Sequence, residues 1–470
     1  MKQRRFRKFI WMMIGLLSGS ASLMAQEIAL NKFSVKQAVE FSLKNSYQVK
    51  NQLEGIKAQE QVNREVTSMA YPQISSSIGF NYFPNIPVQS FPNFIKAATY
   101  GVLENEGVKN GSGNPIISPA DFGFVQAQFG TKLTASASVD WSWLLFDGQV
   151  FVGLQARDAV MLFVKKSKEV TEEQIKTNIH KIYYQLLIGK KQIDGIDANI
   201  VRFEKLSKDV KLIYQNGFAE KLDVDRVTVA LTNLKTEKIK MENMLESGFA
   251  GMKFLMGMSQ KNHLILTDSI TDEHIADDLA DAVYHYNDRK EFQQMEIAEK
   301  LSEYNVKRYK LSYYPTLAAF GTYSENAQRN KFNFFDFSDS WFPTGIVGVK
   351  LSMPIFNGFA KDARVKKAQI ELNQTRNSKE MLKQAIDMEV EQSRIKLRSA
   401  LLTINAQKDN MKLAEEVLNI ATKKFEQGVG PNQDIIIAQT ELKTAQTNYY
   451  AALYDAIISK TDYLKAAGKL

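Results

Sequence analysis

The pattern of apolar and polar positions changes its period several times along the chain. In Gln73–Phe83 and Thr131–Phe146, apolar side chains occupy nearly every second position, with small polar residues between them. Thr316–Tyr323 and Gly345–Phe356 show the same alternation in the second half. A period of two is typical of a β-strand with one apolar face, so the pattern predicts four such strands.

Between these segments, apolar residues recur at three- and four-residue steps, which predicts α-helices. Phe151–Gln215 and Phe359–Gln427 contain no proline, and about 65 residues at about 1.5 Å each give a helix of roughly 100 Å. Such a helix exceeds a globular core and needs partner helices along its length, so bundles or coiled coils follow. In the second segment, the apolar steps run through Leu397, Leu401, Ile404, Met411, Val417 and Ile420. Shorter helices are predicted over residues 34–70, 222–256, 289–313 and 433–467.

The chain also repeats its own plan. Tyr214-x-x-Gly217, followed by Asp223, returns as Phe425-x-x-Gly428, followed by Asp434, with a constant offset of 211 residues. Two further pairs match at offsets of 210 and 243: Leu145-Phe-Asp-Gly148 with Ile355-Phe-Asn-Gly358, and Tyr71-Pro72 with Tyr314-Pro315. The difference indicates an insertion of roughly 33 residues in the first half, within the Pro-, Gly- and aromatic-rich segment 83–130, which has little period of its own. Two structural repeats are therefore predicted.

The strand lengths raise the question of how such a sheet is completed. About 10 to 12 residues suffice to cross a bilayer when the strand is tilted. In lipid a sheet cannot leave strand edges unpaired, and the smallest closed membrane barrels use about eight strands. Four strands must therefore share a barrel with other copies of the chain, and closure alone does not choose between two copies and three. The alternative is a soluble β-sandwich, for which the chain offers no second sheet.

Aromatic residues favour the membrane interpretation, because they cluster at strand ends and on the apolar rows, as interfacial girdles do. These residues are Tyr71, Phe80, Tyr82, Trp141, Trp143, Phe146, Trp341, Phe342 and Phe356.

The first residues predict export. Five basic residues in Met1–Lys8 precede the apolar run Phe9–Leu17 and a small-residue stretch that ends at Ala25. This order is typical of a signal peptide, predicted as residues 1–25, and the apolar run is short for an N-terminal membrane anchor. Without this peptide, the net charge of +8 falls to about +3, so the basic balance reflects targeting and not nucleic-acid binding. The chain has no cysteine, which excludes disulfides and a lipid anchor on a processed cysteine.

No catalytic constellation emerges from the sequence. The four histidines share no metal-ligand spacing, and there is no thiol, glycine-rich phosphate loop or nucleophile elbow. We therefore expect no enzyme activity, no metal and no cofactor. The histidines are His180, His263, His274 and His285.

The doubled order of helix, Tyr-Pro, serine-rich strand, Phe-Asp/Asn-Gly joint, long helix, aromatic-x-x-Gly and aspartate resembles the TolC-like outer-membrane efflux proteins across essentially the full mature chain. The resemblance implies a mixed α and β fold in which a homotrimer shares a twelve-stranded barrel, continued by a long α-helical coiled-coil barrel in the periplasm. The first repeat would cover residues 26–257 and the second residues 289–470, with a linker or equatorial region at 258–288.

The same resemblance implies a passive channel of a tripartite efflux or type I export system, set in outer-membrane lipid. Its partners would be a periplasmic adaptor protein and an inner-membrane pump. The sequence leaves one alternative from another class, a pore-less structural coiled-coil envelope protein or adhesin.

The family also suggests functional residues. The turns with Tyr214 and Gly217, and with Phe425 and Gly428, would form the periplasmic tips that meet the adaptor. Asp223 and Asp434 would line the pore constriction, where rings of like charge favour cations and make opening sensitive to pH. Simpler roles exist for each residue, since glycine permits the left-handed turn and an aspartate is favoured in the first turn of a helix.

The chain departs from the family pattern around these aspartates. Phe425 stands in place of a hydrogen-bonding tyrosine, Gly430 in place of an arginine, and Ile437 in place of a second aspartate. We therefore expect the usual polar latch to be missing. Asp225 and Arg226 lie nearby and either replace it or are simply solvated.

Overall fold

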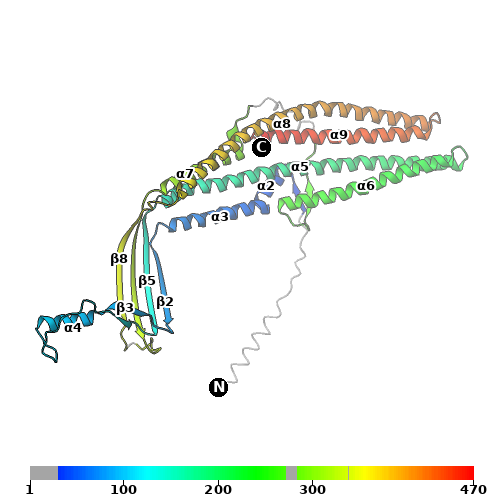
Figure 1. The fold of residues 1–470 in the computed structure, drawn as a ribbon. Helices are drawn as coiled ribbons and strands as arrows, with labels where there is room; N and C mark the ends of the chain where they lie inside the picture. Colours follow the sequence, from blue (N-terminus) through cyan, green and yellow to red (C-terminus); the bar gives the residue numbers. More distant parts are fainter. Residues whose placement is uncertain (1–29, 271–282, 337) are drawn as a thin grey trace, which may run out of the picture. The chain divides into compact units, whose positions relative to one another are not determined.

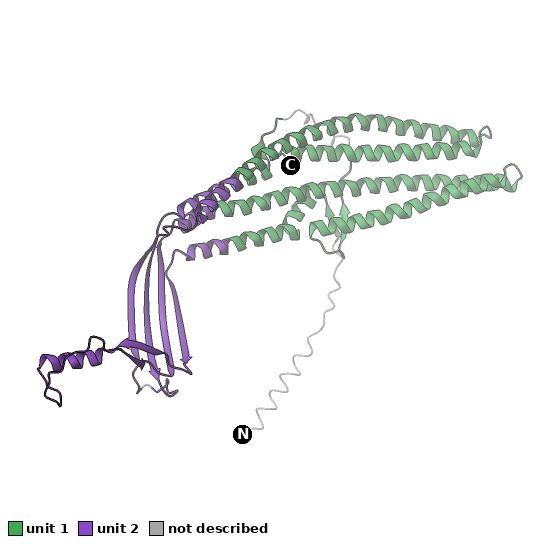
Figure 2. Ribbon diagram, in the orientation of Figure 1, with its two compact units in different colours: residues 1–59, 159–300, 373–470 green, residues 60–158, 301–372 purple. Residues whose placement is uncertain are grey.

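The computed structural model describes residues 30–270 and 283–470, apart from residue 337. The predicted signal peptide and part of the predicted linker lie outside these residues. The fold is mixed α and β and forms two compact units, coloured separately in Figure 2. Unit 1 comprises residues up to 59, 159–300 and 373–470, and unit 2 comprises 60–158 and 301–372. Each unit therefore takes segments from both predicted repeats.

Unit 2 contains a four-stranded antiparallel sheet (Figure 1). Its order is β2 (Gln73–Tyr82), β5 (Leu133–Phe146), β7 (Thr316–Arg329) and β8 (Phe342–Ser352). The four predicted strands are confirmed. β7 is six residues longer than predicted, and β8 ends before Pro354, which has no backbone N–H to donate to a ladder.

Pairing in this sheet separates an apolar face from a polar one. Phe80 pairs with Ala135, which pairs with Ala327, and directly paired residues share a face. On the opposite face, the Ser77 and Ser138 hydroxyls lie 2.9 Å apart, and Asp140 accepts hydrogen bonds from Ser138 and Thr322 at 2.9 and 2.7 Å. Within the described residues, β2 and β8 are each paired along one edge only.

The segment between β2 and β5 is more regular than its sequence pattern predicted. It holds β3 (Val88–Pro92) and β4 (Phe124–Gln128), which pair antiparallel, and the helix α4 (Phe94–Asn105) between them. Five-residue strands leave too few positions for alternation to be recognised, which explains why no element was predicted there.

The helices of unit 1 form two hairpins. α5 (Gly148–Gln215) and α8 (Ala360–Glu426) have 68 and 67 residues and are followed by α6 (Lys221–Met256) and α9 (Asn432–Ala466). All four bounds lie within a few residues of the prediction. None of the described helices has a stretch long and apolar enough to cross a membrane.

The predicted helix over residues 34–70 is divided in two. α2 (Val35–Asn45) ends at Ser46, and α3 (Tyr47–Ser68) follows. The end of α6 packs against this break, because a Cβ at Gly257 would lie 2.3 Å from the Asn45 carbonyl oxygen.

A short parallel sheet, which the sequence did not predict, joins β1 (Leu30–Phe33) to β6 (His263–Leu266). The buried Tyr183 hydroxyl donates to the Phe33 carbonyl oxygen at 3.0 Å and so ties this sheet to α5.

Buried charges hold the C-terminal end of α9 to the start of α7 (Lys290–Leu311). The Arg289 guanidinium, almost fully buried, contacts Glu389 at 2.9 Å and Glu291 at 3.3 Å and donates to the Ala466 carbonyl oxygen at 3.1 Å. Glu173 lies within this electrostatic environment and is 6% exposed. Burial and the neighbouring Glu291 raise the pKa of Glu173, whereas Arg289 lowers it by less.

Candidate functional site at the hairpin tips

The two hairpins end in turns of the same geometry. Gly217 and Gly428 have φ values of 82° and 75°, in the left-handed region that favours glycine. Gly217 donates its N–H to the Tyr214 carbonyl oxygen at 3.0 Å, and Gly428 donates to that of Phe425 at 2.9 Å. The next residue in each turn bonds five positions back, as in a Schellman motif. The repeated spacing found in the sequence therefore reflects a repeated helix ending.

The two predicted constriction residues lie in the first turns of the returning helices. The Asp223 carboxylate accepts the Glu220 backbone N–H at 3.1 Å, in a capping box that begins α6. Asp434 is exposed in the first turn of α9, which begins after Pro431 without a side-chain cap. The capping role is thus present at Asp223. The structure describes one copy of the chain, so rings of aspartates around an axis remain a prediction.

An apolar cluster packs the two hairpins together behind the tips. Its buried members include Phe203 from α5, Val227 from α6, Leu418 from α8 and Ile435 from α9, each at most 3% exposed. Phe425 packs against this cluster as a partly buried side chain. The residue that departs from the family tyrosine therefore contributes apolar contact, which a phenyl ring can make without a hydroxyl partner.

One buried polar contact crosses between the tips. The Asn432 side chain is 4% exposed and donates its Nδ2–H to the backbone carbonyl oxygen of Asp223 at 3.2 Å. Exposed ion pairs also join the hairpins, as between Lys205 and Glu426 at 2.9 Å, but such pairs contribute little in water. Sequence reasoning missed Asn432, because an asparagine at the start of a helix is usually a cap.

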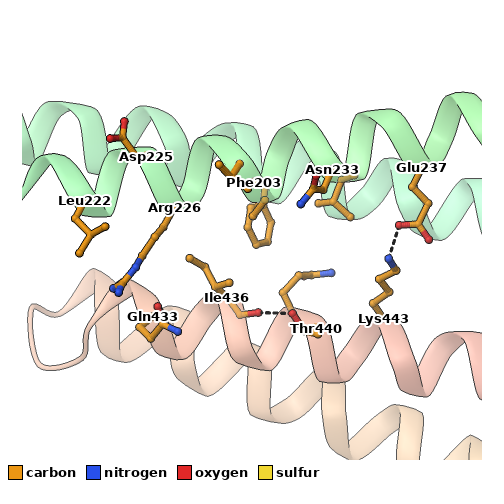
Figure 3. A pocket seen from close by; sticks show the side chains of 14 residues that line it. Phe203, Leu222, Asp225, Arg226, Asn233, Glu237, Gln433, Ile436, Thr440 and Lys443 are labelled. Atoms are coloured by element: carbon orange, nitrogen blue, oxygen red, sulfur yellow. Dashed lines mark hydrogen bonds and ion pairs between the residues drawn. The ribbon is translucent and has the colours of Figure 1, made fainter.

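A cavity of about 610 Å³ lies between α6 and α9 beside the tips, and Figure 3 shows its lining. Arg226 extends from α6 toward Gln433 on α9, and Glu237 forms an ion pair with Lys443. Gln439 also lines the cavity, is 4% exposed, and neither of its amide atoms has a hydrogen-bond partner among the described residues. Asp225 and Arg226 thus line a space between the hairpins rather than meeting the aspartate carboxylates.

Gly430 and Ile437 are the other two positions at which the chain departs from the family pattern. Ile437 is 47% exposed, and a Cβ at Gly430 would meet the Lys424 Cβ at 3.1 Å. Across the described part of the chain, no group of three or more His, Cys, Asp or Glu side chains could hold a metal ion.

Residues 286–469 match the family described as outer membrane efflux protein. Outer membrane protein TolC of Salmonella enteritidis is 20% identical over 346 residues, which cover 71% of this chain and 69% of that protein. Outer membrane efflux protein BepC of Brucella suis biovar 1 (strain 1330) is 22% identical over 167 residues, 36% of each chain. The solved structure of CusC superposes with a TM-score of 0.70 at 13% identity, and the superposition covers 92% of both chains, so the shared fold extends over both predicted repeats.

Proposed function

We propose that this chain, a member of the TolC-like outer membrane efflux protein family, is the outer-membrane channel subunit of a tripartite efflux or type I export system. The protein lies in the outer membrane, with its helical part in the periplasm. Passage would be passive, and an inner-membrane pump with a periplasmic adaptor protein would deliver the substrate.

The observation that carries this proposal is the two-faced sheet, in which β2 and β8 each leave one edge unpaired among the described residues. Ile74, Phe80 and Val349 are at least 50% exposed on its apolar face, whereas serine, threonine and aspartate cover the other face. In lipid, both edges must pair, and pairing β8 of one copy with β2 of the next satisfies them. Closure by itself fits two copies or three, and the resemblance to the TolC-like family favours three; we therefore propose a homotrimer with twelve strands, in which the polar face lines the lumen.

The helices support the same assembly. Val201 on α5 and Leu402 and Ile420 on α8 are 55 to 77% exposed, although they lie on otherwise well-packed helices. Further large apolar side chains are exposed along α8, among them Met381, Met388, Ile395 and Leu413, and so much exposed apolar surface is typical of a helix face that another surface covers. In the proposed trimer, neighbouring hairpins would cover them and complete a coiled-coil barrel.

At the tips, we propose that Asp223 and Asp434 form the constriction and that the turns with Tyr214, Gly217, Phe425 and Gly428 contact the adaptor. Tyr214 is 43% exposed, and the adjacent Phe218 is 85% exposed, which suits a surface that docks against another protein.

Reconstitution in planar bilayers tests the channel directly. We expect detergent-stable trimers with single-channel conductance that prefers cations. Asp434→Asn and Asp223→Asn should shift the reversal potential toward anions, whereas Asp194→Asn, an exposed α5 aspartate paired with Lys191, should leave it unchanged. An elongated oligomer without conductance would overturn the proposal and favour the pore-less envelope protein or adhesin. Copurification of adaptor and pump tests the partners separately.

A further inference from the structure

The loop between β7 and β8 folds back onto the apolar face of the sheet. Phe80, Ala135 and Ala327 form one cross-strand row on β2, β5 and β7. Phe334 from the loop packs on this row and is 2% exposed, and the two alanines beneath are 3% and 1% exposed. Small side chains in the row therefore leave room for an aromatic ring above them.

Phe334 is the centre of a cluster of rings, here called the aromatic plate, which consists of Phe80, Phe332, Phe334, Phe335 and Trp341. Its ring centroids lie 5.7 Å apart for Phe80 and Phe334, 5.5 Å for Phe332 and Phe334, and 6.4 Å for Phe334 and Trp341. The buried rings fix the loop to the sheet, yet Phe332 and Phe335 remain 65% and 71% exposed. The plate thus presents two large apolar rings outward from a supported base.

We propose that the aromatic plate binds the lipid surface of the outer leaflet and anchors the channel at the headgroup boundary. The inference rests on the proposed channel, in which the apolar face of the sheet meets lipid, and the plate continues that face. It lies at the end of the sheet remote from α3, which leads into β2, so a periplasmic helical part places it at the outer leaflet. Aromatic rings partition to this boundary, where one side is apolar and the other wet.

Charged groups around the plate fix its depth. At the end of β7, the Arg329 guanidinium donates to the Ser340 carbonyl oxygen of the loop at 2.9 Å and lies 3.5 Å from Asp339. On the sheet, Glu325 shares the apolar face one row nearer the helices and accepts the Tyr323 hydroxyl hydrogen at 2.7 Å. Because a carboxylate is costly in hydrocarbon, the plate lies at the interface and the rows beyond Tyr323 lie deeper.

Two tryptophans on the same face allow a comparison of depths. Trp141 pairs with Ile74 and lies six residues along β5 from Ala135, or about 20 Å of extended strand. Trp341 belongs to the plate, and its indole N–H has no hydrogen-bond partner within the described residues. Replacing Trp341 by phenylalanine therefore removes no hydrogen bond found there.

The experiment measures fluorescence quenching by brominated phosphatidylcholine in vesicles that contain the full mature oligomer. Trp11 lies in the predicted signal peptide, so W141F/W143F leaves Trp341 as the reporter, and W143F/W341F leaves Trp141. We expect bromines near the headgroup to quench Trp341 most strongly, and bromines near the chain end to quench Trp141 most strongly.

The outcomes separate the anchor from the channel. Quenching of Trp141 without quenching of Trp341 would overturn the anchor while leaving the channel intact. No quenching of either reporter would contradict the membrane placement of the sheet itself. If Trp341 is shielded in the intact oligomer but quenched after its dissociation, the plate contacts a second copy instead of lipid, and the anchor is again overturned.

A second variant tests the exposed rings themselves. In the Trp341 reporter, F332S/F335S should reduce quenching by shallow bromines, because the two rings that reach the lipid are lost. The matched control is F124S, which changes a phenylalanine that is 73% exposed on β4, and quenching should persist. All three side chains are mostly exposed, so folding should survive, and equal quenching in both variants would refute the role of the rings.

Discussion

The Asn432 side chain donates a hydrogen bond from one hairpin tip to the Asp223 backbone carbonyl oxygen of the other, and loss of this bond should loosen the contact between the tips. Asn432→Ala removes one neutral hydrogen bond, worth about 1 kcal/mol. The Asp223 carbonyl lies inside α6 and keeps the helix's own hydrogen bond, so no larger desolvation penalty is added. A change of about 1 kcal/mol raises the population of separated tips about fivefold in each subunit.

In the proposed trimer, three such bonds act on one constriction. If the tips separate in concert, the loss is about 3 kcal/mol, which corresponds to about a hundredfold more spontaneous opening. We would measure this in planar bilayers as the frequency of open events without adaptor. Amide hydrogen exchange should also accelerate in the first turns of α6 and α9, and this readout does not depend on gating.

Asn216→Ala is the matched control, because the Asn216 side chain donates to the Leu212 carbonyl oxygen of its own helix at 2.8 Å. It removes the same chemical group from a tip without touching the other hairpin. Equal opening frequency and equal exchange in the two variants would refute the reasoning, since the cross-hairpin bond would then carry no weight.

Three further substitutions follow from the structure. Gly428→Ala places an alanine in the left-handed region and should lower the free energy of unfolding by about 1 kcal/mol, measured by chemical denaturation. Gly55→Ala lies inside α3 with nothing within 4 Å of the new Cβ and should raise the free energy of unfolding by about 0.5 kcal/mol or more. If both substitutions changed the free energy of unfolding in the same direction, the turn assignment would be contradicted. Because burial raises the pKa of Glu173 above its ordinary 4.5, the folded state holds the proton more tightly, and stability should fall as pH rises from 4.5 through the raised pKa. Glu173→Gln should give a higher melting temperature than wild type at neutral pH and a melting temperature that changes less with pH. If the variant kept the pH dependence of the wild type, Glu173 would not be its cause. Gly321→Ala should prevent assembly of the oligomer on a semi-native gel, because its Cβ would lie 2.1 Å from the Trp141 indole nitrogen; Gly345→Ala, whose Cβ meets Tyr323 at 4.0 Å, should assemble normally.

Sequence patterning predicted the long elements well because their signals accumulate over many residues. The long helices α5 and α8 each have about 19 turns in which to repeat an apolar stripe, and β5 alternates over 14 residues. Breaks caused by tertiary contact leave no such signal. The end of α2 coincides with the close approach of Gly257, more than 200 residues away. No local pattern could have predicted it.

Only those features of the candidate site that depend on local backbone geometry were predicted from the sequence. Repeated spacing located both left-handed glycines and both first-turn aspartates, because each depends on a local helix ending. Asn432 and Gln439 were missed, since their importance comes from burial between two hairpins that are distant in sequence. Val417 and Ile420 were predicted to belong to the apolar row that packs between helices. In the structure they are 39% and 55% exposed, whereas the neighbouring Leu418 is buried.

The two hairpins differ in how their returning helices begin, and this difference separates the roles of the two aspartates. In the first hairpin, the Asp223 carboxylate accepts the Glu220 backbone N–H, and the Asp223 backbone carbonyl oxygen accepts the Asn432 side-chain N–H. Both groups of Asp223 therefore take part in structural hydrogen bonds. In the second, Pro431 precedes α9, which begins without a side-chain cap, and Asp434 is exposed. A carboxylate engaged by a backbone N–H has its charge partly compensated, whereas an exposed one presents its full charge to a passing ion. Asp434 should therefore dominate cation selectivity, and the Asp223 carboxylate should mainly cap α6, although both stand at the same position of the predicted repeat.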